Sequence, residues 1–163
     1  MSSNTNFSDA ALPAIGELAP DFELVDQHGT PVRLSSFRGR TRVVVVFYPW
    51  SFSRVCTGEL CVLRDDLGTL TDLDAQLLAI SVDSKYVQRT FAEREGFTFP
   101  LLADFWPHGE VARRYGIFDG VAGVALRGTF IVDREGVLRW SIVRGIPDAR
   151  DAQQYRDVLA SLD

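Results

Sequence analysis

The stretch from Val43 to Tyr48 restricts the fold of this chain more than any other feature of its sequence. It is an uninterrupted run of β-branched and aromatic residues, and Pro49 follows it directly. A strand that is apolar at every position is typical of a strand covered on both faces, and proline ends such a strand because it lacks an N–H donor. The run therefore predicts a central strand with a layer of structure on each side.

The segments after this strand alternate between helix and strand patterns. Leucines at positions 60, 63, 67 and 70 recur at three- and four-residue spacing, which predicts one amphipathic helix. The pattern then predicts a strand at 77–82 and a helix at 84–95 that ends at Gly96. The remaining predicted elements are a short strand at 100–103, a brief helix at 109–115, a hairpin of strands at 129–132 and 137–143, and a final helix at 148–162.

The N-terminal part contains two further short strand patterns. Residues 21–25 and 32–34 flank a turn at 27–30, which predicts an N-terminal β-hairpin. Residues 1–15 have no sustained periodicity, so we expect a flexible extension, followed by one domain over residues 16–163. This order of elements predicts an α/β protein with a mixed central sheet flanked by helices, which is compatible with a thioredoxin-like fold.

Composition and charge exclude several classes of protein. The chain has 163 residues, 46% hydrophobic and 24% charged, which suits one globular domain that needs no disulfide scaffold or structural metal. Its longest apolar run, 43–50, is shorter than the roughly 18 residues of a membrane span. The net charge of −5, without basic blocks, argues against nucleic acid as a partner. Residues 1–8 do not resemble a secretory signal, so we expect a cytoplasmic protein.

Cys56 lies where a helix is predicted to begin after the central strand. If Ser53 is the N-cap, Cys56 is the third helical residue, where free backbone N–H groups and the helix dipole favour a thiolate. The Ser53 hydroxyl can donate and accept, and so can hold both a thiolate and an oxygen substrate. On position alone, Cys56 reads equally well as a small buried hydrophobic residue, and Ser53 as a simple cap.

Cys61 follows Cys56 by five residues. On an intact helix this spacing separates the Cα atoms by about 8.7 Å, whereas a disulfide needs about 4.4–6.8 Å. A direct bond would require the first turns to unwind, and Gly58 makes that easier, so the spacing favours a redox switch over a permanent disulfide. Two structural cysteines remain possible. Zinc is a poor alternative, because the only other soft ligands, His28 and His108, are distant and unpaired.

The segment from Pro49 to Cys56 resembles the peroxiredoxin signature Pro-x-x-x-Thr/Ser-x-x-Cys, with Ser53 at the hydroxyl position. Residues 20–24 resemble the entry motif of that family, and residues 99–109 and 127–133 are similar to later segments of its alkyl hydroperoxide reductase E type. The resemblance extends from residue 16 to the C-terminus. Cys-x-x-x-x-Cys, by contrast, resembles the Q type (bacterioferritin comigratory proteins), whose resolving cysteine is on the same helix, whereas the E type is usually described with one cysteine.

The resemblance implies a thiol-dependent peroxidase in antioxidant defence that needs neither a metal nor an organic cofactor. Cys56 would attack hydrogen peroxide or an organic hydroperoxide and become a sulfenic acid. Cys61 would resolve it as a Cys56–Cys61 disulfide. A thiol reductant such as thioredoxin, or a mycoredoxin or glutaredoxin-type protein, would then return the enzyme to its reduced form.

Four further residues match positions of the family site. The resemblance implies that Ser53 and Arg127 stabilise the thiolate and the charge that develops on the peroxide, that Glu59 orients Arg127, and that Pro49 shields the sulfur. Without the resemblance, Arg127 would read as a solvated arginine and Glu59 as an exposed helix residue.

The family resemblance also predicts a homodimer, built partly from aromatic surface around Trp50, Phe52 and Trp106. Two other functions stay open. A thioredoxin-like disulfide oxidoreductase would use the same fold but normally carries Cys-x-x-Cys, which residues 56–61 do not supply. A non-enzymatic redox-sensing or chaperone module could be built on the same scaffold.

Overall fold

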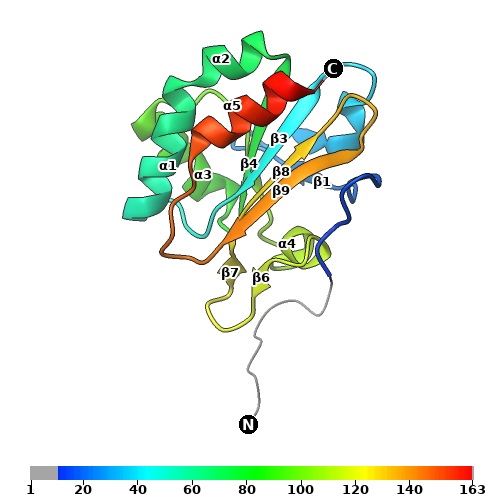
Figure 1. The fold of residues 1–163 in the computed structure, drawn as a ribbon. Coiled ribbons are helices and arrows are strands. Elements are labelled where there is room, and N and C mark those ends of the chain that lie inside the picture. The colour runs from blue at the N-terminus through cyan, green and yellow to red at the C-terminus, as the bar shows by residue number, and fades with distance from the viewer. Residues whose placement is uncertain (1–10, 163) are drawn as a thin grey trace.

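A five-stranded sheet forms the centre of the molecule (Figure 1). The computed structural model describes residues 11–162. Neighbouring strands pair in parallel on one side of β3 and antiparallel on the other, so the predicted mixed central sheet is confirmed. Its strands, in spatial order, are β5 (Leu101–Ala103), β4 (Ala75–Ser81), β3 (Arg42–Phe47), β8 (Arg127–Val132) and β9 (Leu138–Arg144).

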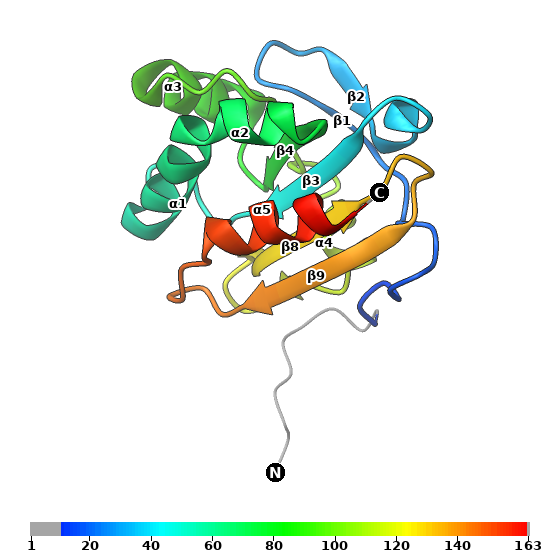
Figure 2. The same cartoon turned by 45° about the horizontal axis from the view of Figure 1, so that its top comes forward.

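Strand β3 is buried along its whole length, as its composition predicts. Successive side chains of a strand point to opposite faces. Val44 and Val46 accordingly pack in one apolar cluster with residues of α1 (Arg54–Asp65), α3 (Lys85–Glu95) and α5 (Ala152–Ser161). Val43, Val45 and Phe47 pack in the other, with residues from the N-terminal hairpin region and α4 (Glu110–Arg114). Figure 2 shows α5 lying across the sheet over β3 and β8.

Two small hairpins lie outside the central sheet. The predicted N-terminal hairpin is confirmed as β1 (Glu23–Val25) paired antiparallel with β2 (Pro31–Arg33), and a short 3-10 helix, Leu34–Phe37, follows it. A second pair, β6 (Phe118–Asp119) and β7 (Val124–Ala125), was not predicted, because two-residue strands leave no periodic pattern.

Two predicted helices differ from the structure. The single helix expected over the leucine repeat is two helices, α1 and α2 (Leu67–Asp72), because Asp66 adopts φ −91° and ψ 1° and turns the chain between them. The final helix begins at Ala152 instead of residue 148. The Asp151 side chain accepts the N–H of Gln153 and caps the helix there.

The predicted flexible extension covers residues 1–15, and its first ten residues lie outside the described part of the chain. The Gly16 N–H donates to the Leu138 carbonyl at 2.8 Å, which ties the chain to the start of β9. Between residues 11 and 162, no helix combines the length and apolar character needed to cross a membrane.

Candidate active site

Helix α1 begins at Arg54, two residues before Cys56. Ser53 has extended backbone angles and is the N-cap, and its Oγ accepts the Cys56 N–H at 3.4 Å. Cys56 is therefore the third residue of the helix, as the sequence predicts. Its side chain is fully buried among residues of the β3 and α1 cluster. Cys56 therefore belongs to the first turn, which carries the free N–H groups and the positive end of the α1 dipole.

The loop between β3 and α1 is fastened to Asp83, which follows β4 by two residues. The Ser51 N–H donates to Asp83 Oδ2 at 2.9 Å, and Ser81 Oγ donates to the same oxygen at 2.7 Å. The Tyr48 hydroxyl and Ser51 Oγ lie 3.1 Å apart. Pro49, between these anchors, is buried. These contacts hold the segment that precedes the N-cap against the carboxyl end of the sheet.

Phe52 fastens the same loop to α3. Its φ of +70° lies in the left-handed region, which is unusual for an aromatic residue and costs conformational energy. Its ring packs on Phe91 at 4.9 Å between centroids, and the Arg94 guanidinium lies 5.3 Å from the ring centre. Phe52 is nevertheless 42% exposed, and Trp50 is 40% exposed. Trp50 and Phe52 thus form an apolar rim of two partly exposed aromatic rings beside the helix start.

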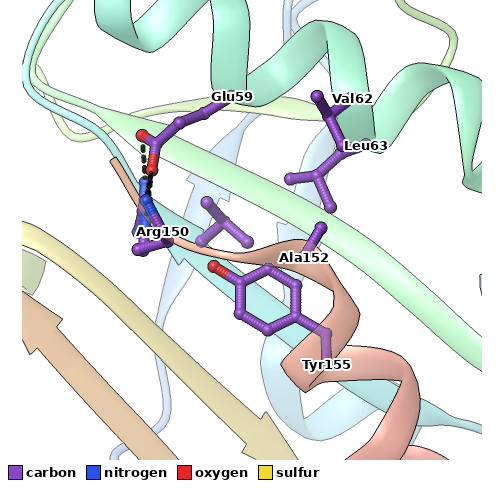
Figure 3. A pocket seen from close by; sticks show the side chains of 7 residues that line it. Glu59, Val62, Leu63, Arg150, Ala152 and Tyr155 are labelled. Atoms are coloured by element: carbon purple, nitrogen blue, oxygen red, sulfur yellow. Dashed lines mark hydrogen bonds and ion pairs between the residues drawn. The ribbon is translucent and has the colours of Figure 1, made fainter. Parts of the chain in front are cut away.

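Glu59 lies one turn after Cys56 and bonds two buried arginines. Glu59 Oε1 accepts from Arg127 Nη1 at 2.5 Å and from Arg150 Nη2 at 2.9 Å, while Oε2 accepts the Arg150 backbone N–H at 2.6 Å and its Nε–H at 2.9 Å. Figure 3 shows the Arg150 side chain facing the Glu59 carboxylate. The side chains of Arg127 and Arg150 are each 2% exposed, and that of Glu59 is 6% exposed. Neither Arg127 nor Glu59 is the solvated residue that its local sequence alone would suggest.

Backbone carbonyl groups also hold both arginines in place. Arg127 Nε donates to the Ile146 carbonyl at 2.5 Å, and Arg150 Nη1 donates to the Gly128 carbonyl at 2.9 Å. Two guanidinium groups and one carboxylate leave this buried group with a net positive charge. Residues three apart lie on the same side of a helix, so Glu59 brings the group to the side of α1 that carries Cys56.

The two arginines determine the ionisation of Glu59. Burial alone would raise the pKa of this carboxyl group, but the hydrogen bonds and charge of Arg150, with the charge of Arg127, outweigh it and hold the pKa below its usual range. Glu59 is therefore an anion at neutral pH. Such a carboxylate can orient a guanidinium toward an anionic or polarised oxygen partner.

A small cavity lies between α1 and α5 beside this group. Its volume of about 30 Å³ has room for roughly one water molecule, so it is too small for an organic substrate. Figure 3 shows Glu59, Arg150 and Tyr155 at its polar side. The lining residues are Val46, Glu59, Val62, Leu63, Arg150, Ala152 and Tyr155.

Cys61 lies in different surroundings on the same helix. Both cysteines are free thiols, and α1 is continuous between them, through Gly58. Cys61 is partly buried, and its Sγ lies 3.5 Å from Glu95 Oε2 of α3. In the part of the chain that the structure describes, no three His, Cys, Asp or Glu side chains gather as a metal site.

Arg150 is the site residue that sequence reasoning missed. It precedes α5 and lies 91 positions from Glu59, so no local spacing connects the two residues. The tertiary structure alone brings it to the first turns of α1. Of the residues predicted for the site, Glu59 and Arg127 are in direct contact, and Ser53 contacts the backbone of Cys56.

Comparisons with known proteins identify the family of this chain. The model of the AhpC/TSA family matches residues 15–141. The chain is 45% identical over 148 residues to alkyl hydroperoxide reductase E of Mycobacterium tuberculosis, covering 91% of this chain and 97% of that protein. It is 36% identical over 150 residues to thioredoxin peroxidase of Echinococcus granulosus, covering 86% and 76%.

A solved structure shows the same fold. The crystal structure of peroxidoxin BcpB from Mycobacterium tuberculosis superposes with a TM-score of 0.82 at 33% identity, over 91% of this chain and 97% of that one. The thioredoxin-like fold expected from the order of elements is therefore confirmed. With its fold, its family match and its relatives in agreement, this chain belongs to the AhpC/TSA family and is a peroxiredoxin, a thiol peroxidase with an antioxidant function.

Proposed function

We propose that Cys56 is the thiol that reduces peroxide, with hydrogen peroxide and organic hydroperoxides as substrates. One observation carries this assignment: the buried Glu59–Arg127–Arg150 group lies one helical turn from Cys56, at the positive end of α1. A thiolate is the reactive form of cysteine, and cations and a helix N-terminus both favour it. No other cysteine of the chain combines these features.

The reaction needs donors for the charge that develops as the O–O bond breaks. The Cys56 thiolate attacks one peroxide oxygen, the other oxygen leaves as water or alcohol after gaining a proton, and Cys56 becomes a sulfenic acid. Arg127 supplies fixed N–H donors, and Glu59 orients them. The Ser53 hydroxyl holds the substrate oxygen beside the sulfur, and Pro49 shields the sulfur from water.

We assign Cys61 as the resolving thiol. Its sulfur attacks the sulfur of the Cys56 sulfenic acid, a disulfide forms, and the hydroxyl leaves as water. Because an intact helix keeps the two Cα atoms about 8.7 Å apart, α1 must unwind locally for this bond to form. A thioredoxin, mycoredoxin or glutaredoxin-type protein then reduces the disulfide. We place the enzyme in the cytoplasm, where such thiol reductants maintain a reducing environment.

Cysteine variants and mass spectrometry test both assignments. After one equivalent of peroxide, the wild-type chain should lose two hydrogens in mass, while Cys61→Ser should consume peroxide once and retain one added oxygen. Cys56→Ser should consume none. Peroxide consumption by Cys56→Ser, with none by Cys61→Ser, would reverse the assignment. A stable added oxygen on the wild type would remove Cys61 as the resolving thiol, and an external thiol would then recycle the enzyme.

We also propose a homodimer formed through aromatic surface near the active site. The rings of Trp50, Phe52 and Trp106 are 40%, 42% and 82% exposed. Ser84, next to the Asp83 that anchors the Trp50 loop, lines an open apolar groove of about 270 Å³ together with Trp106. This proximity supports one continuous surface. Sedimentation at high protein concentration should give the mass of a dimer, and a monomer mass would contradict the proposal.

A further inference from the structure

The last residue of α3 contacts α1 at two points. Cys61 Sγ donates to Glu95 Oε2 at 3.5 Å, and Arg64 Nη1 donates to the Glu95 backbone carbonyl at 2.7 Å. Cys61 and Arg64 are three residues apart and therefore share one side of α1. Glu95 thus connects the end of α3 to the part of α1 that carries the second cysteine, which follows Glu59 by two residues and therefore faces about 200° around the helix from it.

The surroundings of Cys61 favour the thiol over the thiolate. Burial raises the pKa of Cys61; Arg64 opposes this effect, while the Glu95 hydrogen bond and the charges of Glu95 and Asp65 reinforce it, so the pKa lies above its usual range. Arg64 is itself paired with Asp65 at 3.0 Å. A thiol with a raised pKa is mostly protonated at neutral pH and reacts slowly as a nucleophile.

We propose that Glu95 is a positioning residue that keeps Cys61 docked on α3 as a protonated thiol, and thereby delays disulfide formation until α1 unwinds. This inference rests on the proposed resolving role of Cys61. The Cys61–Glu95 contact would control the timing of disulfide formation, the second step of the reaction. The arginine group serves the first step, the reduction of peroxide.

The distance between the two cysteines on α1 explains why the Cys61–Glu95 contact should slow disulfide formation. While Cys61 touches Glu95, α1 is intact, and the two cysteine Cα atoms are too far apart for a disulfide. The contact therefore exists only in the folded, unreactive arrangement, and it must break before the sulfurs meet. An interaction confined to the starting state stabilises that state and slows the step that leaves it.

The chemical step balances without another reagent. Once α1 unwinds, Cys61 leaves Glu95, and its thiol loses a proton to water. The thiolate attacks the sulfur of the Cys56 sulfenic acid, the S–S bond forms, and the S–O bond breaks. The departing hydroxide takes up a proton and becomes water. The oxidising equivalents come from the peroxide already consumed.

The delay has a consequence for inactivation. A sulfenic acid that waits can meet a second peroxide and become a sulfinic acid, which thiols do not reduce. A stronger Cys61–Glu95 contact would therefore increase the fraction of chains lost to sulfinic acid at high peroxide concentration. A weaker contact would favour the disulfide.

Three α3 variants test the proposal. Glu95→Gln removes the charge but keeps the size of the side chain, and Glu95→Ala removes the contact. Glu93→Gln is the matched control, because Glu93 is exposed on the same helix and pairs with Arg89. Circular dichroism establishes that each variant is folded, and Glu95→Gln keeps the test available if Glu95→Ala does not fold.

The first readout is the pH dependence of Cys61 alkylation, measured with iodoacetamide in a Cys56→Ser background. Both Glu95 variants should shift the alkylation profile to lower pH, and Glu93→Gln should not shift it. The second readout is the rate of disulfide formation after one equivalent of peroxide. It should rise about two- to fivefold in the Glu95 variants, the range expected for a partly exposed charged contact, and the sulfinic fraction at excess peroxide should fall.

The possible failures are distinguishable. If the wild type forms no Cys56–Cys61 disulfide, the resolving role fails and the delay fails with it, while the alkylation profile still reports the contact. If the wild type forms the disulfide and Glu95→Gln changes neither readout, the positioning role alone is overturned. Slower disulfide formation in Glu95→Gln would also overturn it, because Glu95 would then promote the attack of Cys61.

Discussion

The two cysteines of α1 lie five residues apart in surroundings of opposite charge. Cys56 is fully buried in the first turn, one turn from two guanidinium groups that share a single carboxylate. Cys61 is partly buried in the middle of the helix and contacts a carboxylate of α3. The position of a thiol relative to helix ends and charges, more than its residue type, therefore determines which step it can perform.

The surroundings of Cys56 and Cys61 also differ in the part of the fold to which they are attached. The arginines near Cys56 are bonded to the backbone of β8 and of the segment that precedes α5, so they belong to the sheet side of the molecule. Cys61 is held by α3. If α1 unwinds, Arg127 and Arg150 can keep these hydrogen bonds to the backbone, whereas the hydrogen bond between Cys61 and Glu95 must break.

Oxidation should open α1 and leave α5 intact. Formation of the disulfide requires the helix to unwind, so amide exchange between Arg54 and Arg64 should accelerate at least about a hundredfold, or roughly 2.7 kcal/mol of local stability. Hydrogen–deuterium exchange with mass spectrometry measures this change. Residues 152–161 serve as the internal control, and oxidised Cys61→Ser should keep α1 protected. Equal acceleration in both helices would mean that the domain unfolds as a whole.

Glu59→Gln should destabilise the region around Cys56 strongly. The substitution leaves two buried guanidinium groups without their shared anion, which typically costs about 3–5 kcal/mol. Denaturant unfolding at pH 7 measures this loss. If the unfolding free energy fell by less than about 1 kcal/mol, water would be replacing the lost hydrogen bonds of the two arginines. The group would then be less isolated from solvent than its burial indicates.

The effect of Glu59 should also depend on pH in a definite direction. Because its pKa is lower in the folded chain than in the unfolded one, its contribution to stability is present above the unfolded pKa of about 4.3 and is lost as the pH falls through the lower folded value. The difference in unfolding free energy between wild type and Glu59→Gln should therefore shrink below pH 4. A constant difference down to pH 2 would contradict the lowered pKa.

Arg127→Ala should slow peroxide reduction at least about tenfold, or roughly 1.4 kcal/mol of barrier, because the substitution removes fixed donors for the developing charge. Stopped-flow measurement of the first turnover tests this in the reduced enzyme. Arg127→Lys keeps the charge without the planar fork and should recover part of the rate. An unchanged rate in a folded Arg127→Ala variant would remove Arg127 from the site.

The fold was largely predictable because strong local patterns specify its main elements. The run 43–48 identifies β3, and Ser84 and Gly96 mark both ends of α3 by an N-cap and a left-handed C-cap. The break at Asp66 was not predictable, because the leucine repeat continues through it and only the backbone turn ends α1. The pair β6–β7 depends on tertiary packing and has no pattern of its own.

The site was predictable only where it is local. The N-cap at Ser53 and the placement of Cys56 follow from a short segment whose residues are neighbours in sequence. Family resemblance alone predicted Arg127 as a site residue. Nothing in the sequence predicted Arg150, because its partner Glu59 lies 91 positions away. The contact of Cys61 with Glu95 likewise joins α1 and α3, which are separated along the chain by α2 and β4, so no local spacing in the sequence indicates it.

Arg94→Gln should have the smallest effect and should act on the Cys56 side alone. Arg94 precedes Glu95 in the last turn of α3, but its guanidinium lies over the Phe52 ring, before the helix start, instead of beside Cys61. A cation–π contact at a partly exposed ring contributes about 0.5–1 kcal/mol, so disulfide formation should accelerate by about two- to fivefold as the loop loosens. Quenched-flow alkylation and mass spectrometry measure that rate.

Arg89→Gln is the matched control for Arg94→Gln, because Arg89 lies on the same helix, 59% exposed and paired with Glu93. It should leave the rate unchanged. The sharper distinction is the alkylation of Cys61 in the Cys56→Ser background: Arg94→Gln should not shift its pH profile, whereas Glu95→Gln should. A shift caused by Arg94→Gln would mean that the last turn of α3 holds the loop and Cys61 as one unit, and the two regions of α1 would then not be independent.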